Sequence, residues 1–236
     1  MSTWIFERGP RFWMALASAF ALLAVSGCLS PVRDSRQVQR TALFQGGAIV
    51  ASPAGYCIDE SHVRRRDQGS FVLMAGCAHI GGEGPMVDPA VITVSVLPDE
   101  PGVRHATAEE LAEKLSPNAA PLEMVNEEDL ALVHLASGGD RAMPGGDPRH
   151  WRGSMVLNGH LTGLAVYAPR DSRLAGAAGR RLVTELADTL RNANPAAGLA
   201  EGGHADDARQ SGSDQARDGP RGALGTFLSG LFGNSS

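Results

Sequence analysis

Short apolar runs bounded by Gly, Pro or Asp follow one another along the middle of the chain, a pattern typical of β-strands. They cover residues 48–52, 71–77, 91–97, 130–136, 151–157 and 161–167. Asn158-Gly159 separates the last two runs and predicts a tight hairpin, because both positions tolerate a positive φ. Most connections are too short for parallel crossovers, so we expect an antiparallel sheet of about six strands.

A capping motif followed by an apolar face predicts a short helix after the third run. Thr107 and Glu110 stand three positions apart, as in a capping box in which the first residue caps the helix and the second reaches back to it. Leu111 and Leu115 continue one apolar face, and Pro117 ends it.

A longer amphipathic helix is predicted at the end of the apolar region. Asp171 or Ser172 caps it, and it runs to about Asn192. Its apolar stripe repeats every four positions and consists of Leu174, Ala178, Leu182, Leu186 and Leu190. Strands and helices in this order predict an α+β domain over residues 42–192, in which one short and one long helix pack on the sheet.

The order of these elements resembles the Mog1/PsbP-like sandwiches found in several small exported or lumenal proteins. The resemblance rests on element order and on no residue motif, so it implies a fold and transfers no function. A domain of about 150 residues buries ~70% of its unfolded surface. Its core therefore needs no cofactor, and we expect none.

The first residues of the chain have the pattern of a signal peptide. Arg8 and Arg11 precede an apolar run over residues 12–25. As a helix this run spans roughly 21 Å at ~1.5 Å per residue, which is too short for the ~30 Å hydrocarbon core of a bilayer. We therefore interpret residues 1–27 as a signal peptide that ends just before Cys28.

Val25-Ser26-Gly27-Cys28 resembles the lipobox of bacterial lipoprotein precursors. The resemblance implies cleavage between Gly27 and Cys28, a diacylglycerol on the Cys28 thiol and an acyl chain on the new amino group. Membrane lipid then becomes a partner through acylated Cys28. By the same resemblance, Leu29 in place of Asp favours an outer-membrane lipoprotein that faces the periplasm, with the inner membrane as the alternative. The competing interpretation is an ordinary signal peptide or an uncleaved anchor that ends in Cys.

Two further cysteines, Cys57 and Cys77, would then lie in an oxidising compartment, where disulfides persist. Two neighbouring strands joined through residues 62–69 can place them opposite one another. A bridge that closes this loop contributes roughly 3 kcal/mol in the chain-entropy model. Two alternatives stay open: a metal site with His62 and His79, whose spacing fits no paired-ligand motif, and two separate thiols.

The charge balance argues against a nucleic-acid-binding protein. With 21 Lys+Arg against 26 Asp+Glu the formal net charge is -5, whereas phosphate binding needs a concentrated basic surface. Arg64-Arg65-Arg66 is the densest basic cluster. We interpret it as a solvated hairpin loop, with an anion or lipid-headgroup contact as the alternative.

A search for catalytic chemistry finds no nucleophile elbow, P-loop, HExxH or CxxC motif. The acidic runs at residues 109–113 and 127–129 have the pattern of solvated surfaces. His134 lies in an apolar run, which favours a hydrogen-bonded core or edge residue over a ligand. Asp140 and Asp147 flank a Gly-rich turn but lack the spacing of a calcium loop.

Two polar segments and an apolar stripe flank the domain. We interpret residues 28–41 as a lipidated tether and residues 193–222 as a disordered linker, because the linker holds almost no large apolar side chain. Residues 223–236 form a short amphipathic segment with the stripe Leu224, Phe227, Leu228, Leu231 and Phe232. This segment is either a docking helix or a frayed tail, since its glycines disfavour a helix.

Together these features predict a lipid-anchored protein of the bacterial envelope. We expect its exported domain to bind or to support an assembly, without catalysis and with an envelope protein as the candidate partner. The alternatives are an envelope enzyme with an unrecognised site around Cys57 to His79 and a membrane-bound structural spacer.

Overall fold

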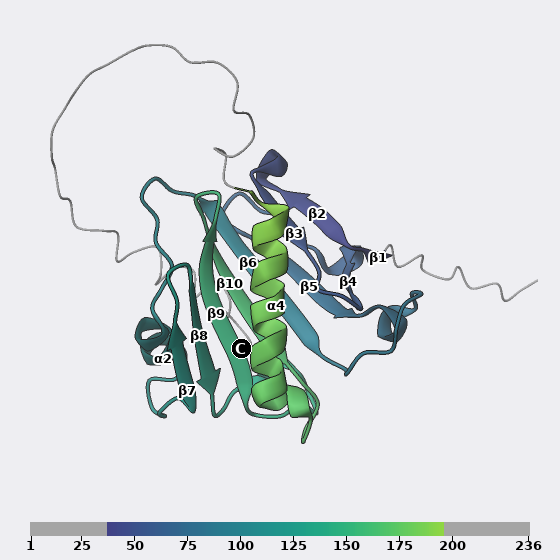
Figure 1. Ribbon diagram of the computed structural model, residues 1–236, viewed down its shortest axis with the longest axis vertical. Helices are drawn as coiled ribbons and strands as arrows, with labels where there is room; N and C mark the ends of the chain where they lie inside the picture. Colours follow the sequence, from purple (N-terminus) through teal and green to yellow (C-terminus); the bar gives the residue numbers. More distant parts are fainter. Residues whose placement is uncertain (1–36, 196–236) are drawn as a thin grey trace, which may run out of the picture. The chain divides into compact units, whose positions relative to one another are not determined.

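An eight-stranded antiparallel sheet forms the centre of residues 37–195, the part of the chain that the computed structural model describes (Figure 1). Its strand order is β1-β4-β5-β6-β10-β9-β8-β7. In that order the strands are Gln37–Val38, Tyr56–Asp59, Ser70–Gly76, Val91–Asp99, His160–Tyr167, His150–Leu157, Leu130–Leu135 and Glu123–Asn126. A separate antiparallel hairpin joins β2 (Arg40–Leu43) to β3 (Ala48–Ala51).

Helices occupy several of the connections between these strands. The α-helices of the described part are α2 (Ala108–Leu115), α3 (Gly139–Ala142) and α4 (Ala177–Ala193). Single 3₁₀ turns are η1 (Phe44–Gly46), η2 (Glu60–His62), η3 (Cys77–Ile80) and η4 (Arg173–Ala175). Between residues 37 and 195, no helix has the length and apolarity needed to span a membrane.

The α+β class and the antiparallel sheet are as predicted, whereas the prediction of about six strands with two helices is too low. The additional strands include β1, β2 and β7, which are only two to four residues long and half polar, so that apolar periodicity does not reveal them. A further strand, β4, follows the predicted run at residues 48–52, because Pro53 and Gly55 separate it from β3. Residues 37–41, which the sequence suggests are tether, lie within or between β1 and β2.

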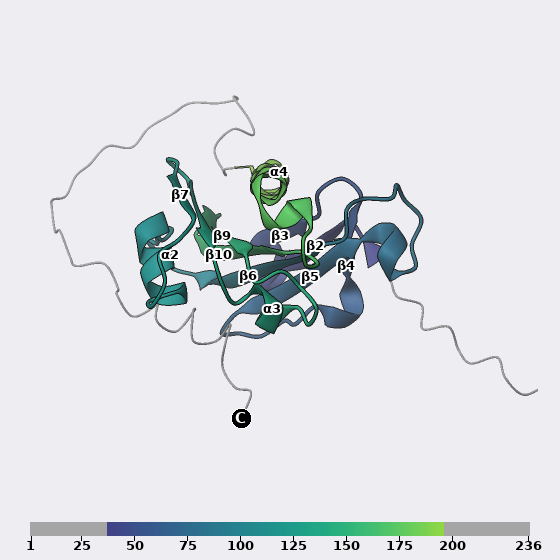
Figure 2. The ribbon, with the colours of Figure 1, turned by 90° about the horizontal axis from the view of Figure 1, so that it is seen from below.

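Two apolar layers lie on opposite faces of the sheet. Alternate residues of β8 divide between them: Leu130 and Leu132 join the core beneath α4, while Ala131 and Val133 pack with α2. We call these the α4 face and the α2 face. Figure 2 shows α4 lying along one side of the sheet, where it also contacts β3, β9 and β10.

The local motifs fold largely as the sequence predicts. Thr107 Oγ1 accepts the Glu110 N–H at 3.3 Å and the Thr107 N–H donates to Glu110 Oε2 at 2.9 Å, which completes the capping box of α2. Asn158 and Gly159 have φ values of 48° and 84° in the turn between β9 and β10. Ser172 caps η4 instead of α4, because the non-helical backbone of Gly176 separates the two helices.

Asn194 fixes the end of α4 against β3. Its side-chain oxygen accepts the Ile49 N–H at 2.8 Å, and its amide group donates to Ile49 O and to Leu190 O, each at 2.7 Å. The amide therefore replaces the backbone partners that a helix end loses. Through Ile49, it also joins the end of α4 to a strand 145 residues earlier in the chain.

Candidate functional site

The disulfide Cys57–Cys77 forms the centre of the candidate region. Cys57 lies in β4 and pairs with Ala75 of β5. Cys77 directly follows β5, and its N–H donates to Gly55 O at 3.0 Å. This register brings the two Cα atoms to 4.9 Å and the sulfur atoms into a bond, so the predicted disulfide is confirmed.

Gln39 lies over the buried sulfur atoms. Cys57 is 5% and Cys77 2% exposed, whereas Gln39 is exposed to solvent. The Gln39 Nε2 donates to Cys57 Sγ at 3.1 Å and lies 3.7 Å from Cys77 Sγ. Ser52 holds this side chain, because its hydroxyl donates to Gln39 Oε1 at 2.8 Å and its N–H to Gln39 O at 3.0 Å.

Gln37 extends this cover from β1 to the segment after η3. Its Nε2 donates to Ile80 O at 2.6 Å. An added Cβ on Gly82 would lie 1.4 Å from Gln37 Oε1, so glycine is needed there for the Gln37 carboxamide to fit. Residues 37–39 thus contact both sides of the disulfide region.

His62 does not approach the cysteines but binds within its own 3₁₀ turn. Its Nδ1 lies 2.6 Å from Asp59 Oδ2 and 3.0 Å from Ser61 Oγ. Burial raises the pKa of Asp59, but hydrogen bonds from Ser61 and His62 outweigh it and hold this pKa below its usual range. A catalytic relay instead directs the two ring nitrogens of His to different partners. The three side chains therefore cap η2 and do not form a relay.

The structure gives the cysteines no role as thiolate ligands, because both sulfur atoms are in the disulfide. His79 is exposed and packs against Gly76, where an added Cβ would lie 2.4 Å from His79 Nδ1. Across residues 37–195, no group of three or more His, Cys, Asp or Glu side chains is placed to hold a metal ion.

The basic cluster at residues 64–66 is exposed and bound to nearby polar groups. Arg64 donates to Ser61 O at 3.0 Å, and Arg65 donates to Thr41 Oγ1 at 2.6 Å. The same stretch carries three carboxylates, those of Asp59, Glu60 and Asp67. The formal charges of residues 59–67 therefore sum to zero with His62 neutral.

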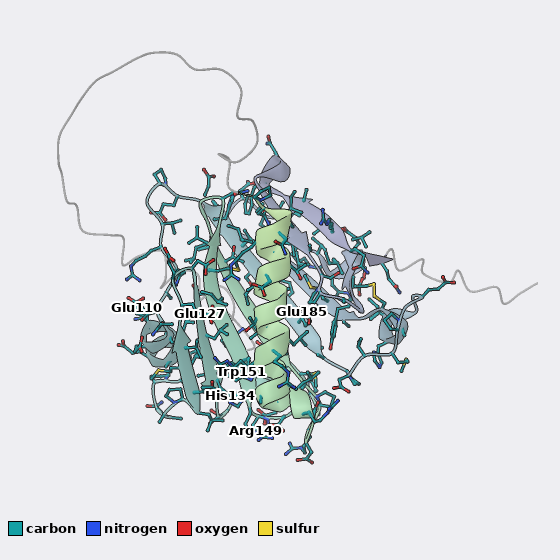
Figure 3. All side chains as sticks on the ribbon, in the orientation of Figure 1. Glu110, Glu127, His134, Arg149, Trp151 and Glu185 are labelled. Carbon is teal, nitrogen blue, oxygen red and sulfur yellow. A yellow bond between two sulfur atoms is a disulfide. The ribbon has the colours of Figure 1, made fainter. Side chains whose placement is uncertain are left out.

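His134 is a buried structural residue on the α4 face. Figure 3 shows it beside Trp151 near one end of α4, and their rings stack with centroids 4.5 Å apart. His134 Nε2 lies 2.8 Å from Ala175 O, and Trp151 Nε1 donates to Gly176 O at 2.9 Å. Both rings thereby hold the η4 segment that leads into α4. Desolvation lowers the pKa of His134.

A second buried cluster on the α2 face has no signal in the sequence. His150 stacks on Tyr167 with centroids 5.2 Å apart, and the guanidinium of Arg152 lies 5.7 Å from the centre of the Tyr167 ring. His150 and Arg152 are each 5% exposed. Desolvation, followed by the charge of Arg152, lowers the pKa of His150 to about 4.

Asp147 joins the loop before β9 to the loop after β10. It is 3% exposed and accepts two hydrogen bonds from the Arg149 guanidinium, both at 2.9 Å. The N–H groups of Arg149 and Asp171 donate to the same carboxylate at 3.0 and 3.1 Å. The Arg149 side chain is the main reason why the pKa of Asp147 lies well below its usual range. This geometry is a loop clamp.

Two carboxylates of the acidic run on α2, those of Glu109 and Glu110, bind polar side chains of neighbouring segments. Glu110 pairs with Arg104 at 2.7 Å, which is the main cause that lowers the Glu110 pKa to about 2. Glu109 accepts the Asn126 amide at 3.0 Å. Figure 3 shows Glu110 and Glu127 on the same side of the molecule, near α2 and β7.

The sheet edge at β7 exposes apolar side chains. Leu122 is 53% and Met124 45% exposed; within the described part, the other large exposed apolar residue is Met86, at 77%. β7 is the last strand of the sheet and pairs with β8. As the terminal strand, β7 has a neighbouring strand on one side only, and Leu122 and Met124 leave apolar surface there.

No known protein family, curated protein or solved structure matches this chain. The predicted signal peptide over residues 1–27, the lipidation residue Cys28 and the stripe from Leu224 to Phe232 lie outside the described residues.

Proposed function

We propose that this protein is a lipid-anchored envelope protein whose α+β domain binds a partner at the edge of its sheet. The proposed lipid anchor rests on the motif Val25-Ser26-Gly27-Cys28, which follows an apolar run. The buried Cys57–Cys77 disulfide supports export, because disulfides persist in oxidising compartments.

The chain length between anchor and domain limits how far the β1 edge can lie from the lipid-bearing residue. Nine residue steps separate Cys28 from Gln37, and each spans at most ~3.6 Å, so β1 starts within roughly 32 Å of the lipid-bearing residue. β7 is the opposite edge of the sheet. Seven strand spacings of ~4.8 Å place it roughly 34 Å from β1. In this proposal β1 faces the bilayer and β7 is the edge presented to a partner.

The charges around β7 indicate the chemistry of that partner. Glu127 and Glu128 directly follow the strand and are exposed, as is Glu113 on the neighbouring helix α2. A segment that adds to this edge must contact Leu122 and Met124 beside these carboxylates. We therefore propose an extended, basic segment of an envelope protein, bound by strand addition.

Lipidation is tested by labelling cells with palmitate and by the intact mass of the purified protein. We expect the wild type to carry both the palmitate label and the added acyl mass, and Cys28→Ser to carry neither. Label retained in Cys28→Ser would exclude Cys28 as the lipid carrier.

The binding edge is tested by a photoreactive amino acid placed at position 124 in cells. We expect an adduct with an envelope protein whose yield falls when Glu127 and Glu128 are both replaced by Lys. Position 86 is the matched control, because Met86 is the more exposed methionine but lies outside β7. Equal yields from both positions, or yields insensitive to the charge reversal, would contradict the proposed edge.

A further inference from the structure

The first described residues of the domain pass directly over its disulfide. We propose that residues 37–39 are a strap that controls the access of thiols to Cys57–Cys77, so that the bond exchanges with a dithiol only after the strap opens. The inference needs no lipid on Cys28, so it stands or fails independently of the anchor.

The contacts of Gln39 are the first reason. Both sulfur atoms are almost fully buried, while the side chain that touches them faces solvent. The Gln39 amide thus lies between the disulfide and the solution, closer to Cys57 Sγ, at 3.1 Å, than to Cys77 Sγ, at 3.7 Å. Ser52 holds the amide in this position through Gln39 Oε1.

The shortness of β1 is the second reason. Two residue pairs, Gln37 with Asp59 and Val38 with Ile58, join this strand to β4, and it is an edge of the sheet. Its further attachments are the hydrogen bond from Gln37 to Ile80 O and the half-buried side chain of Val38, which packs against the core. A two-residue edge strand opens far more readily than the central strands, since little buried surface depends on it.

Opening of the strap uncovers the strand that holds one sulfur atom. β1 is the neighbour of β4 on its outer side, and Cys57 lies in β4. Cys77 has other cover, because an added Cβ on Gly84 would lie 3.2 Å from its Cβ. Cys57 Sγ is therefore the atom that an entering thiolate reaches first.

The exchange follows ordinary thiol–disulfide chemistry with a dithiol as reductant. Its thiolate attacks Cys57 Sγ, the S–S bond breaks, and the electron pair leaves on Cys77 Sγ, which takes up a proton. The second thiol of the reductant then attacks the mixed disulfide and releases Cys57. The products are two protein thiols and the oxidised, disulfide form of the reductant. With the strap closed, the first step is blocked.

The test measures how fast dithiothreitol reduces the native full-length chain. Cys28→Ser is the background, because it leaves Cys57 and Cys77 as the remaining cysteines of the three. Alkylation of the released thiols followed by intact mass gives the rate. Gln39→Ala removes the cover, Val38→Pro removes a backbone N–H from β1, and Gln68→Ala is the control at an exposed glutamine in the turn before β5.

We expect Gln39→Ala and Val38→Pro to raise the reduction rate about tenfold or more, while Gln68→Ala leaves it unchanged. The melting temperature of Gln39→Ala should match that of its background. Low urea should hardly change the rate in the background protein, because local opening exposes little surface. Equal rates in all variants, or a rate that follows urea as steeply as global unfolding does, would overturn the strap.

Discussion

The burial of His150 makes the stability of the domain depend on pH, and the size of this effect follows from the structure. Burial lowers the pKa of His150 from 6.5 to about 4. Between these values the unfolded chain binds a proton that the folded chain does not, so stability falls as the pH falls through this window. From pH 7 to pH 5 we expect His150 alone to cost about 2 kcal/mol of unfolding free energy.

Urea denaturation of the wild type and of His150→Phe at pH 7, 6 and 5 measures this contribution. Phenylalanine keeps a ring against Tyr167 but cannot be protonated. The variant should therefore lose about 2 kcal/mol less than the wild type over this range. His134, whose pKa burial also lowers, is present in both proteins and cancels from the comparison. Parallel pH curves for the two proteins would refute the burial argument.

Three further changes test other contacts. Replacing Cys57 and Cys77 together by Ala should lower the unfolding free energy by about 3 kcal/mol, since the bridge spans 20 residues. Urea titrations of the reduced wild type should show the same loss, and a loss below about 1 kcal/mol would contradict a stabilising role of the disulfide. Thr107→Ala should cost about 1 kcal/mol by removing the cap of α2, measured by thermal melting; an unchanged melting temperature would show that the cap does not contribute. Asn194→Ala should lower the unfolding free energy by about 1–3 kcal/mol because it leaves the Ile49 N–H without its acceptor, whereas Asn192→Ala, at an exposed position, should leave it unchanged. Equal effects of the two substitutions in urea titrations would argue against the contact between Asn194 and β3.

The sequence predicts the parts of the fold that apolar side chains specify. β6 and β8 contain continuous or alternating apolar residues, and the turn at Asn158-Gly159 needs positive φ values that its residues adopt readily. β7 could not be predicted in this way. Its residues are alternately exposed and half-buried, and backbone pairing with β8 creates the strand.

The candidate site could be predicted only in part, for a similar reason. The disulfide could be predicted because Cys57 and Cys77 stand in neighbouring extended stretches joined by a polar segment, a pattern visible along the chain. The cover by Gln39 joins residues 18 and 38 positions apart, and a glutamine carries no signal for such a contact. His150 is equally hidden, because its position beside Tyr167 depends on the register of β9 against β10.

The two edges of the sheet differ in the contacts that they leave open. Both edge strands are short, which limits unwanted strand pairing. At β1 the polar side chains bind within the domain: Gln37 donates to Ile80 O, and the adjoining Gln39 donates to Cys57 Sγ. At β7, Leu122 and Met124 remain exposed beside carboxylates. Carboxylates keep such an edge soluble, yet they do not cover the apolar contacts. This difference agrees with the proposed orientation, in which the edge with internal contacts lies toward the anchor and the edge with open contacts lies toward the partner.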